Sequence, residues 1–323
     1  MSSNPFLTAE EAADLLKISK YTLYELVKRA ELPAQRVGRQ LRFHRDELNQ
    51  ILRGSVVATG TADSQQESSE INLLPDDRNT SIRQYAADLR FVGSHDPVVE
   101  MLAEFLKYAS PSVVLDCAFT GSMEGLHSLY QGEAELTGIH LWDEKTGEYN
   151  LSFIEYLLPG ESVTVVNLAQ RVQGWIVPPG NPLQMRTMQD IAKPGVRFIN
   201  RQKGSGTRLR IDSFLRKSGI PSASITGYEF EETTHFGVAY RIANGEANAG
   251  IGVQTSASRL GLDFVPLYHE RYDLVCLEKT VQTTHWKQLL AVLRSPAFQN
   301  AIRSQAGYDP TLTGTYIQRG EKV

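Results

Sequence analysis

The stretch from residue 198 to residue 210, Phe-Ile-Asn-Arg-Gln-Lys-Gly-Ser-Gly-Thr-Arg-Leu-Arg, combines glycines, hydroxyls and arginines in a pattern that suits an anion. A strand-like run precedes the turn Gly204-Ser205-Gly206, and a helix is expected from Thr207 onward. The first amides of a helix lack intrahelical acceptors, and glycines let a ligand approach them. The hydroxyls of Ser205 and Thr207 and the guanidinium of Arg208 are further donors. The alternative is an ordinary helix whose N-cap is Ser205.

Gly-Ser turns recur at two other expected strand ends, at Gly93-Ser94 and at Gly121-Ser122. Helices that follow the strands of an open α/β sheet begin at the edge of the sheet where ligands bind. The three turns therefore predict a cleft lined by helix N-termini. A further helix is expected to begin at Thr234-His235 and to add donors from the opposite side of the cleft.

Arginines, histidines and one tyrosine complete the candidate ligand contacts. Arg171, Arg201 and Arg208 are the candidate cations, and at least one of them is expected to pair with a structural acid. A lone histidine is more often a core or capping residue than a ligand donor, and Tyr149 belongs either to a lid or to an ordered loop. The predicted ligand contacts are Ser94, His95, Ser122, Tyr149, Arg171, Arg201, Gly204, Ser205, Gly206, Thr207, Arg208, Thr234 and His235.

Residues 81–323 alternate strand-like and helix-like segments, which is typical of an α/β fold. We expect two lobes, the first at about 81–170 and 270–323 and the second at about 175–265. Strands are expected at 89–92, 113–118, 134–141, 225–230, 249–253, 262–267 and 272–277, and residues 163–168 and 174–177 are expected to form one long extended segment that leaves the first lobe. Helices are expected at 98–108, 122–130, 207–217 and 235–243.

Residues 1–53 are predicted to form a separate winged helix-turn-helix domain. Thr8 and Glu11 have the spacing of a capping box, Ser19 is placed to cap a second helix, and residues 36–43 alternate like a small β-wing. Residues 54–80 are small and polar, as in a linker. The predicted DNA contacts are Ser19, Lys20, Tyr21, Thr22, Tyr24, Lys28, Arg36, Arg39 and Arg42.

Length and composition limit the function classes. A chain of 323 residues predicts two or three domains, and a net charge of −4 argues against a protein that coats nucleic acid along its whole surface. The cysteines Cys117 and Cys276 lie in separate apolar runs, as buried reduced thiols do, and no metal cluster is evident. The sequence shows neither a membrane span nor an export signal, so a cytoplasmic location is expected.

Two resemblances follow from these motifs. Residues 7–13, 36–39 and 42–43 resemble the excisionase-type winged helix-turn-helix related to the MerR family, which implies DNA binding. Residues 89–314 resemble the cytoplasmic members of the type 2 periplasmic-binding-protein fold. The motifs that carry this second resemblance are Gly93–Asp96, Gly121–Leu126, Gly138–Leu141, Thr146–Asn150, Asn200–Arg208, Thr233–His235 and Gly307–Asp309. This family is associated with molybdenum-cofactor genes, which implies molybdate or tungstate as the ligand. Its usual Arg-x-Gln-Gly-Leu tract reads Arg171-Val172-Gln173-Gly174-Trp175 here.

The sequence therefore predicts a one-component transcription regulator, not an enzyme, that needs no cofactor or metal. It is expected to bind operator DNA and a small anion and to form a homodimer or higher homo-oligomer without a membrane partner. A pterin or a carboxylate is the alternative ligand. A hydrolase built on Ser205 and His235 is disfavoured, because the nucleophile-elbow pattern Gly-x-Ser-x-Gly is missing.

Overall fold

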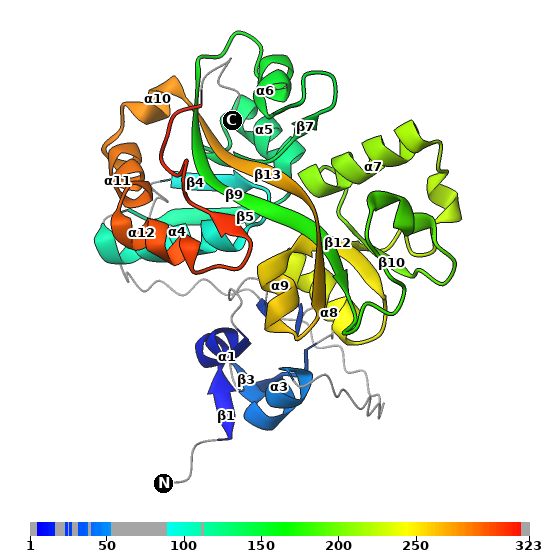
Figure 1. Ribbon diagram of the computed structural model, residues 1–323. Coiled ribbons are helices and arrows are strands. Elements are labelled where there is room, and N and C mark those ends of the chain that lie inside the picture. Colours follow the sequence, from blue (N-terminus) through cyan, green and yellow to red (C-terminus); the bar gives the residue numbers. More distant parts are fainter. Residues whose placement is uncertain are drawn as a thin grey trace, which may run out of the picture.

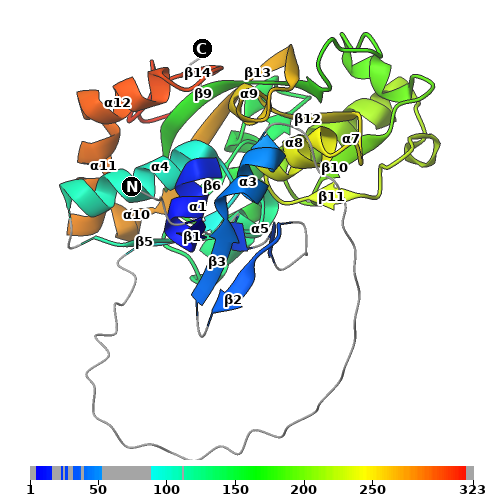
Figure 2. The same cartoon turned by 90° about the horizontal axis from the view of Figure 1, so that it is seen from below.

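The N-terminal domain is a three-stranded sheet with helices on it. The computed structural model describes residues 5–16, 23–24, 26–27, 32–37, 40–52, 89–110 and 113–317. The strand order is β1-β3-β2, and both pairings are antiparallel. The elements of this domain are β1 (Phe6–Thr8), α1 (Ala9–Leu16), β2 (Gln35–Val37), β3 (Gln40–His44) and α3 (Arg45–Leu52). Strands β2 and β3 form the predicted wing (Figure 2).

The predicted capping box is confirmed. The amide of Thr8 donates to Glu11 Oε2 at 2.8 Å, and the amide of Glu11 donates to Thr8 Oγ1 at 3.2 Å. Of the predicted DNA contacts, Tyr24 is exposed, the Arg42 side chain is half-buried, and the backbone of Arg36 lies in β2. The following lie outside the described residues: Ser19, Lys20, Tyr21, Thr22, Lys28, Arg39 and the linker 54–80.

Two long antiparallel strands form the backbone of the second domain. Strands β9 (Val163–Val177) and β13 (Asp263–Leu277) each have 15 residues and pair along their whole lengths. They cross the centre of the molecule and belong to both lobes (Figure 1). The sheet order is β11-β10-β12-β9-β13-β6. The expected separate strands at 262–267 and 272–277 are thus two parts of β13.

The first lobe packs helices against short strands and one end of the long pair. Strands β4 and β5 are parallel, and their buried side chains share a core with the helices. The elements are β4 (Leu89–Gly93), α4 (Pro97–Ala109), β5 (Leu115–Phe119), α5 (Ser122–Gln131), β6 (Thr137–Ile139), α10 (Glu278–Val281), α11 (Thr284–Leu293), α12 (Pro296–Arg303) and β14 (Tyr308–Asp309). A small hairpin and one helix follow β6, namely β7 (Trp142–Asp143), β8 (Glu148–Tyr149) and α6 (Leu151–Leu157).

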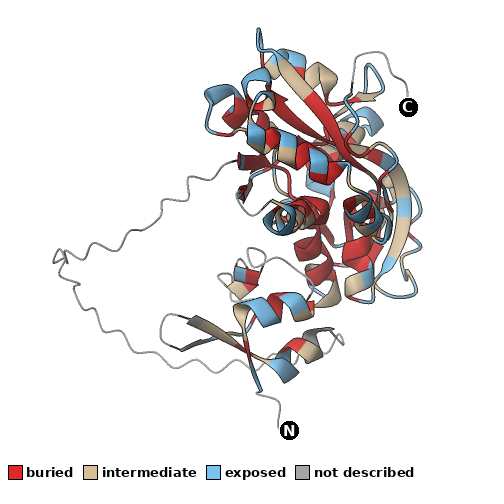
Figure 3. Cartoon of the chain, turned by 90° about the vertical axis from the view of Figure 1, so that its left-hand side faces the viewer, coloured by how far each residue is buried: buried red, intermediate tan, exposed pale blue. Residues whose placement is uncertain are grey.

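The second lobe surrounds the other end of the long strands. Its elements are η1 (Met188–Ala192), β10 (Phe198–Arg201), α7 (Gly206–Ser218), η2 (Ser222–Ser224), β11 (Glu231–Glu232), α8 (His235–Ala243), β12 (Ala249–Val253) and α9 (Gln254–Arg259). The expected strand at 225–230 is wrong, because Gly227 has φ of +88° and residues 225–230 form turns that lead into β11. Buried residues concentrate along the central strands (Figure 3). In the described part of the chain, no helix is long and apolar enough to cross a membrane.

Candidate ligand site between the two lobes

The predicted Gly-Ser turns converge where the lobes meet. The amide of Met123, at the start of α5 in the first lobe, donates to the carbonyl of Gly204 in the second lobe at 3.1 Å. The amide of Gly121 donates to the carbonyl of Gly93 at 3.0 Å, which links the two turns of the first lobe. A Cβ atom on Gly206 would lie 2.4 Å from the carbonyl oxygen of His140. The helix N-termini of the two lobes are therefore in direct contact.

A buried ionic cluster lies at this junction. Arg171 on β9 forms an ion pair with Asp96, the N-cap of α4, and a second one with Glu270 on β13. Its Nε donates to Glu270 Oε2 at 2.9 Å, and the hydroxyl of Tyr308 donates to Asp96 at 2.8 Å. Arg171, Asp96 and Glu270 are each at most 2% exposed. The positive charge of Arg171 is therefore matched by two carboxylates of the chain itself.

Glu270 is the centre of this hydrogen-bond network. Besides Arg171, it contacts His140 Nδ1 at 2.7 Å and accepts from Gln173 Nε2 at 2.7 Å. Burial acts to raise the pKa of Glu270, but His140 and Arg171 outweigh it and hold that pKa well below the usual range. The other ring nitrogen of His140 lies 2.8 Å from Ser94 Oγ, so the hydrogen-bond network extends to the Gly93-Ser94 turn.

Arg201 is the one guanidinium of the three candidates that contacts no carboxylate among the described residues. It ends β10, is 1% exposed, and donates to the carbonyls of Glu232 and Thr233 at 3.2 and 3.0 Å. Its Nη1 lies 2.8 Å from Nδ1 of His235. Burial, followed by repulsion from Arg171, lowers the pKa of Arg201 to about 10. A buried cation held only by neutral acceptors is a position that favours an anion.

His235 begins α8 and lies against Arg201. Burial, and then the charges of Arg201 and Arg171, keep the pKa of His235 well below its ordinary value. The ring is therefore neutral at pH 7, and one nitrogen accepts from the guanidinium. Thr234 caps the same helix, because its hydroxyl accepts from the amide of Gly237 at 2.9 Å.

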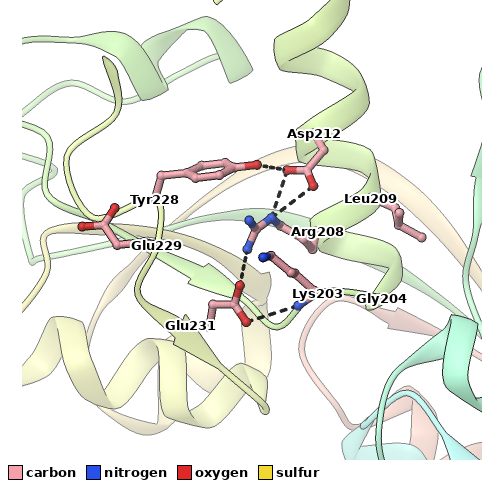
Figure 4. A pocket seen from close by; sticks show the side chains of 8 residues that line it. All are labelled: Lys203, Gly204, Arg208, Leu209, Asp212, Tyr228, Glu229 and Glu231. Atoms are coloured by element: carbon pink, nitrogen blue, oxygen red, sulfur yellow. Dashed lines mark hydrogen bonds and ion pairs between the residues drawn. The ribbon is translucent and has the colours of Figure 1, made fainter. Parts of the chain in front are cut away.

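Arg208 makes its side-chain contacts within the second lobe. It pairs with Asp212 at 3.0 Å and Glu231 at 2.8 Å and stacks on Tyr228 at 4.3 Å from the ring centre. These groups line a depression of about 430 Å³ on the second lobe (Figure 4). Arg171 and Arg208 both pair with acids, in agreement with the expectation that at least one candidate arginine would do so.

Most of the predicted hydroxyl contacts serve the protein's own backbone or side chains. Ser205 caps α7 by accepting from the amide of Arg208 at 3.2 Å, and Ser122 Oγ accepts from the amide of His140 at 3.3 Å. Thr207 Oγ1 accepts from Gln173 Nε2 at 3.1 Å. His95 contacts Glu100, on its own side of the first lobe, at 3.0 Å. The amides of Gly206 and Thr207, in the first turn of α7, have no intrahelical acceptor.

Sequence reasoning missed several members of the cluster. Four members, Asp96, His140, Gln173 and Glu270, were not among the predicted contacts. The Gln173 side chain is buried, and its Oε1 makes no hydrogen bond. No spacing in the sequence joins Glu270 to Arg171, which is 99 positions away. Their proximity is a consequence of how β13 pairs with β9.

The fold defines a class of protein. In this class, a two-lobed domain with a buried, polar interlobe junction is joined to a domain of the DNA-binding type. Residues 103–294 match the PBP superfamily domain, and residues 6–55 match a helix-turn-helix domain. The chain is 33% identical over 317 residues to the uncharacterized protein YvgK of Bacillus subtilis, a similarity that covers 98% of this chain and 99% of that protein. The chain belongs to the PBP superfamily domain family, and the predicted fold is confirmed.

Two further similarities concern parts of the chain. A segment of 54 residues, 17% of this chain, is 44% identical to 69% of a putative DNA-binding protein of Mycobacterium tuberculosis. A solved structure of a putative phosphate ABC transporter substrate-binding protein from Clostridium perfringens, with bound phosphate, has a TM-score of 0.55 and 16% identity. It covers 68% of this chain and 98% of that one, which supports the two-lobed fold.

Proposed function

We propose that this chain is a one-component transcription regulator that binds a small anion between its lobes and operator DNA through its N-terminal domain. The observation that carries the proposal is Arg201, a buried guanidinium that contacts no carboxylate among the described residues and lies at the start of α8. Burying a charge without a counter-ion is costly, so an anion at this position would stabilise the closed arrangement of the lobes.

The first candidate ligand is an oxyanion, molybdate or tungstate. A tetrahedral oxyanion has acceptor oxygens in several directions, which suits a guanidinium together with the amides at the first turns of α7 and α8. Phosphate has the same shape and is bound by the similar solved protein, so it is a useful third probe.

The second candidate ligand is a small organic anion, such as a pterin or a carboxylate. Two observations favour it. Arg171 is already matched by Asp96 and Glu270, so Arg201 is the one of the three candidate arginines that contacts no carboxylate among the described residues. In addition, Oε1 of Gln173 is a buried acceptor without a donor, and an organic ligand with a hydroxyl or amino group can satisfy it.

A hydrolase finds no support in the geometry. Ser205 Oγ donates to the carbonyl of Gln202 at 2.9 Å and accepts from the amide of Arg208, while His235 contacts Arg201. Ser205 and His235 therefore do not form the nucleophile–base pair that an activated serine requires.

Calorimetric titration of the full chain with molybdate, tungstate, phosphate and acetate tests the ligand. We expect one of these anions to bind the parent chain, Arg201→Met to lose that binding, and Arg216→Met, at an exposed arginine on α7, to keep it. Binding by Arg201→Met at the parental affinity would contradict the site. Absence of binding by all three inorganic anions would remove the oxyanion version.

The regulatory part of the proposal requires coupling between the two domains. The anion that binds should change the affinity for an operator selected from random duplexes, and the operator should change the anion affinity by the same factor. Such a regulator acts where the DNA is, in the cytoplasm, and we propose a homodimer that reads a two-fold operator. Light scattering of the free chain and of its DNA complex measures the oligomeric state.

A further inference from the structure

Arg210 extends from α7 of the second lobe into a cage of three aromatic rings. Its Cζ atom lies 3.7 Å from the ring centre of Tyr268, 4.7 Å from that of Trp142 and 5.9 Å from that of Tyr149. Its Nη1 also donates a hydrogen bond to the hydroxyl of Tyr149. Within the part of the chain that the structure describes, the partners of this guanidinium are thus aromatic rings and a neutral hydroxyl.

The cage is anchored to the first lobe and to the central strands. Trp142 and Tyr149 face each other across the β7–β8 hairpin, where they are register partners. The hydroxyl of Tyr149 donates to the carbonyl of His269 on β13 at 2.9 Å, and Arg271 donates to the carbonyl of Tyr149 at 2.9 Å. These bonds hold Tyr149 to β13, so the hairpin does not depend on the second lobe for its position.

Asn150 fixes the base of the same hairpin. It is fully buried, its Oδ1 accepts from the amide of Leu141 at 2.6 Å, and its Nδ2 donates to Asp273 at 2.7 Å. When the lobes separate, Trp142 and Tyr149 therefore stay with the first lobe, while Arg210 leaves with α7. The guanidinium can contact these two rings only when the lobes are together.

We propose that Arg210 is an interlobe latch that stabilises the closed arrangement and thereby controls access to the anion site. The regulatory meaning of the latch rests on the proposed function, while the lobe contact itself does not. The stacked arginine adds to other polar contacts between the lobes, among them the bond from the amide of Met123 to the carbonyl of Gly204 and that from Thr255 Oγ1 to the carbonyl of Ala306. Loss of the cation–π contacts with Trp142 and Tyr149 is expected to lower the ratio of closed to open molecules on the order of tenfold.

Distance measurements between two spin labels test the latch without any added anion. Cysteines replace Gln131, at the end of α5, and Lys217, near the end of α7, two exposed positions in different lobes. The native thiols of Cys117 and Cys276 can remain, because burial raises the pKa of each to about 12 and so suppresses labelling.

The parent is expected to show a short closed distance, and Arg210→Ala to shift population to a longer one. Arg210→Lys, which keeps the charge but loses the planar group, should fall between the two, and Arg216→Ala should match the parent. Trp142→Ala should open the lobes in part, and the double variant should match Arg210→Ala. The latch is refuted if Arg210→Ala and the parent have the same distribution, or if the parent lacks the closed distance. Failure of anion binding at Arg201 would leave this result untouched.

Discussion

Arg171 and Glu270 are register partners on β9 and β13, and they form a buried ion pair in which Arg171 Nε lies 2.9 Å from Glu270 Oε2. The pair lies near the middle of two strands that both lobes share. The carboxylate of Glu270 also contacts His140 of the first lobe and accepts from Gln173 of β9. One side chain therefore connects the polar groups on the two sides of the junction. The central strands thus carry the polar framework of the site as well as the connection between the lobes.

Replacing Glu270 by glutamine should destabilise the protein strongly. The change leaves Arg171 with Asp96 alone and puts an amide where three donors need an acceptor, so we expect a loss of about 3–5 kcal/mol in the free energy of unfolding. Urea unfolding followed by circular dichroism measures it. Glu229→Gln, at an exposed carboxylate, should change the free energy by less than about 0.5 kcal/mol. Equal effects of the two changes would contradict the central role of Glu270.

His235 should make the protein less stable as the pH falls below neutrality. Its pKa in the folded protein lies well below that in the unfolded chain, which is about 6.5, so the unfolded chain alone takes up the proton in this range. The stabilisation is complete above about pH 6.5 and declines by up to about 1.4 kcal/mol per pH unit below it. Urea unfolding between pH 7.5 and 5.5 measures this slope. His140, with a pKa that is also lowered, adds a slope of the same sign.

His235→Gln is the control for this dependence, because glutamine can still accept from Arg201 and does not titrate. The variant should keep the smaller slope that His140 provides. A variant and a parent with parallel pH profiles would show that His235 takes up its proton equally in the folded and the unfolded protein.

Gly206→Ala should hold the lobes apart without harming α7. An added Cβ would lie 2.4 Å from the carbonyl oxygen of His140, which is backbone and cannot move freely. Alanine is otherwise favourable in a helix, so the free energy of unfolding should change little. We expect the anion affinity to fall at least about tenfold, because the site needs closed lobes. Titration calorimetry measures it, with Lys217→Ala on the same helix as the control.

Arg42→Ala should weaken DNA binding at all sequences alike. Arg42 lies on the wing strand β3, where we expect its guanidinium to contact a phosphate. Loss of one phosphate contact reduces the slope of log K against log salt by about 1. Fluorescence anisotropy with selected and scrambled duplexes at several salt concentrations measures the slope. Glu133→Gln, an exposed change in the first lobe, should leave it unchanged, whereas a loss confined to the selected duplex would indicate a base contact.

The sequence predicted those features that depend on neighbouring residues. The capping box of Thr8 and Glu11, the start of α8 at His235 and the turn before α7 all follow from local hydrogen bonding and backbone geometry. The prediction of a strand at 225–230 was wrong. It followed the apolar residues of this segment and gave too little weight to Gly227, whose positive φ turns the chain there.

The cleft itself was predicted only in outline. Three glycine turns were enough to indicate where helix N-termini meet, because each of them lies between the end of a strand and the start of a helix. Which arginine remains without an acid was not predictable, since Asp96, Glu270, Asp212 and Glu231 reach their partners through the packing of separate elements. Arg210 carried no signal in the sequence, and its aromatic partners come from residues 142–149 and 268.

By itself, the sequence determined the order of the elements, the presence of two domains and the helix starts that face the cleft, because hydrophobic periodicity and capping are properties of short segments. Tertiary structure alone decided how the charges are distributed. The register of β13 against β9 places Glu270 on Arg171, and the packing within the second lobe places Asp212 and Glu231 on Arg208. Among the three candidates in the described part of the chain, Arg201 is therefore the buried cation that contacts no carboxylate. Electrostatic pairing acts between atoms that are close in space, and no local pattern in the chain encodes that distance.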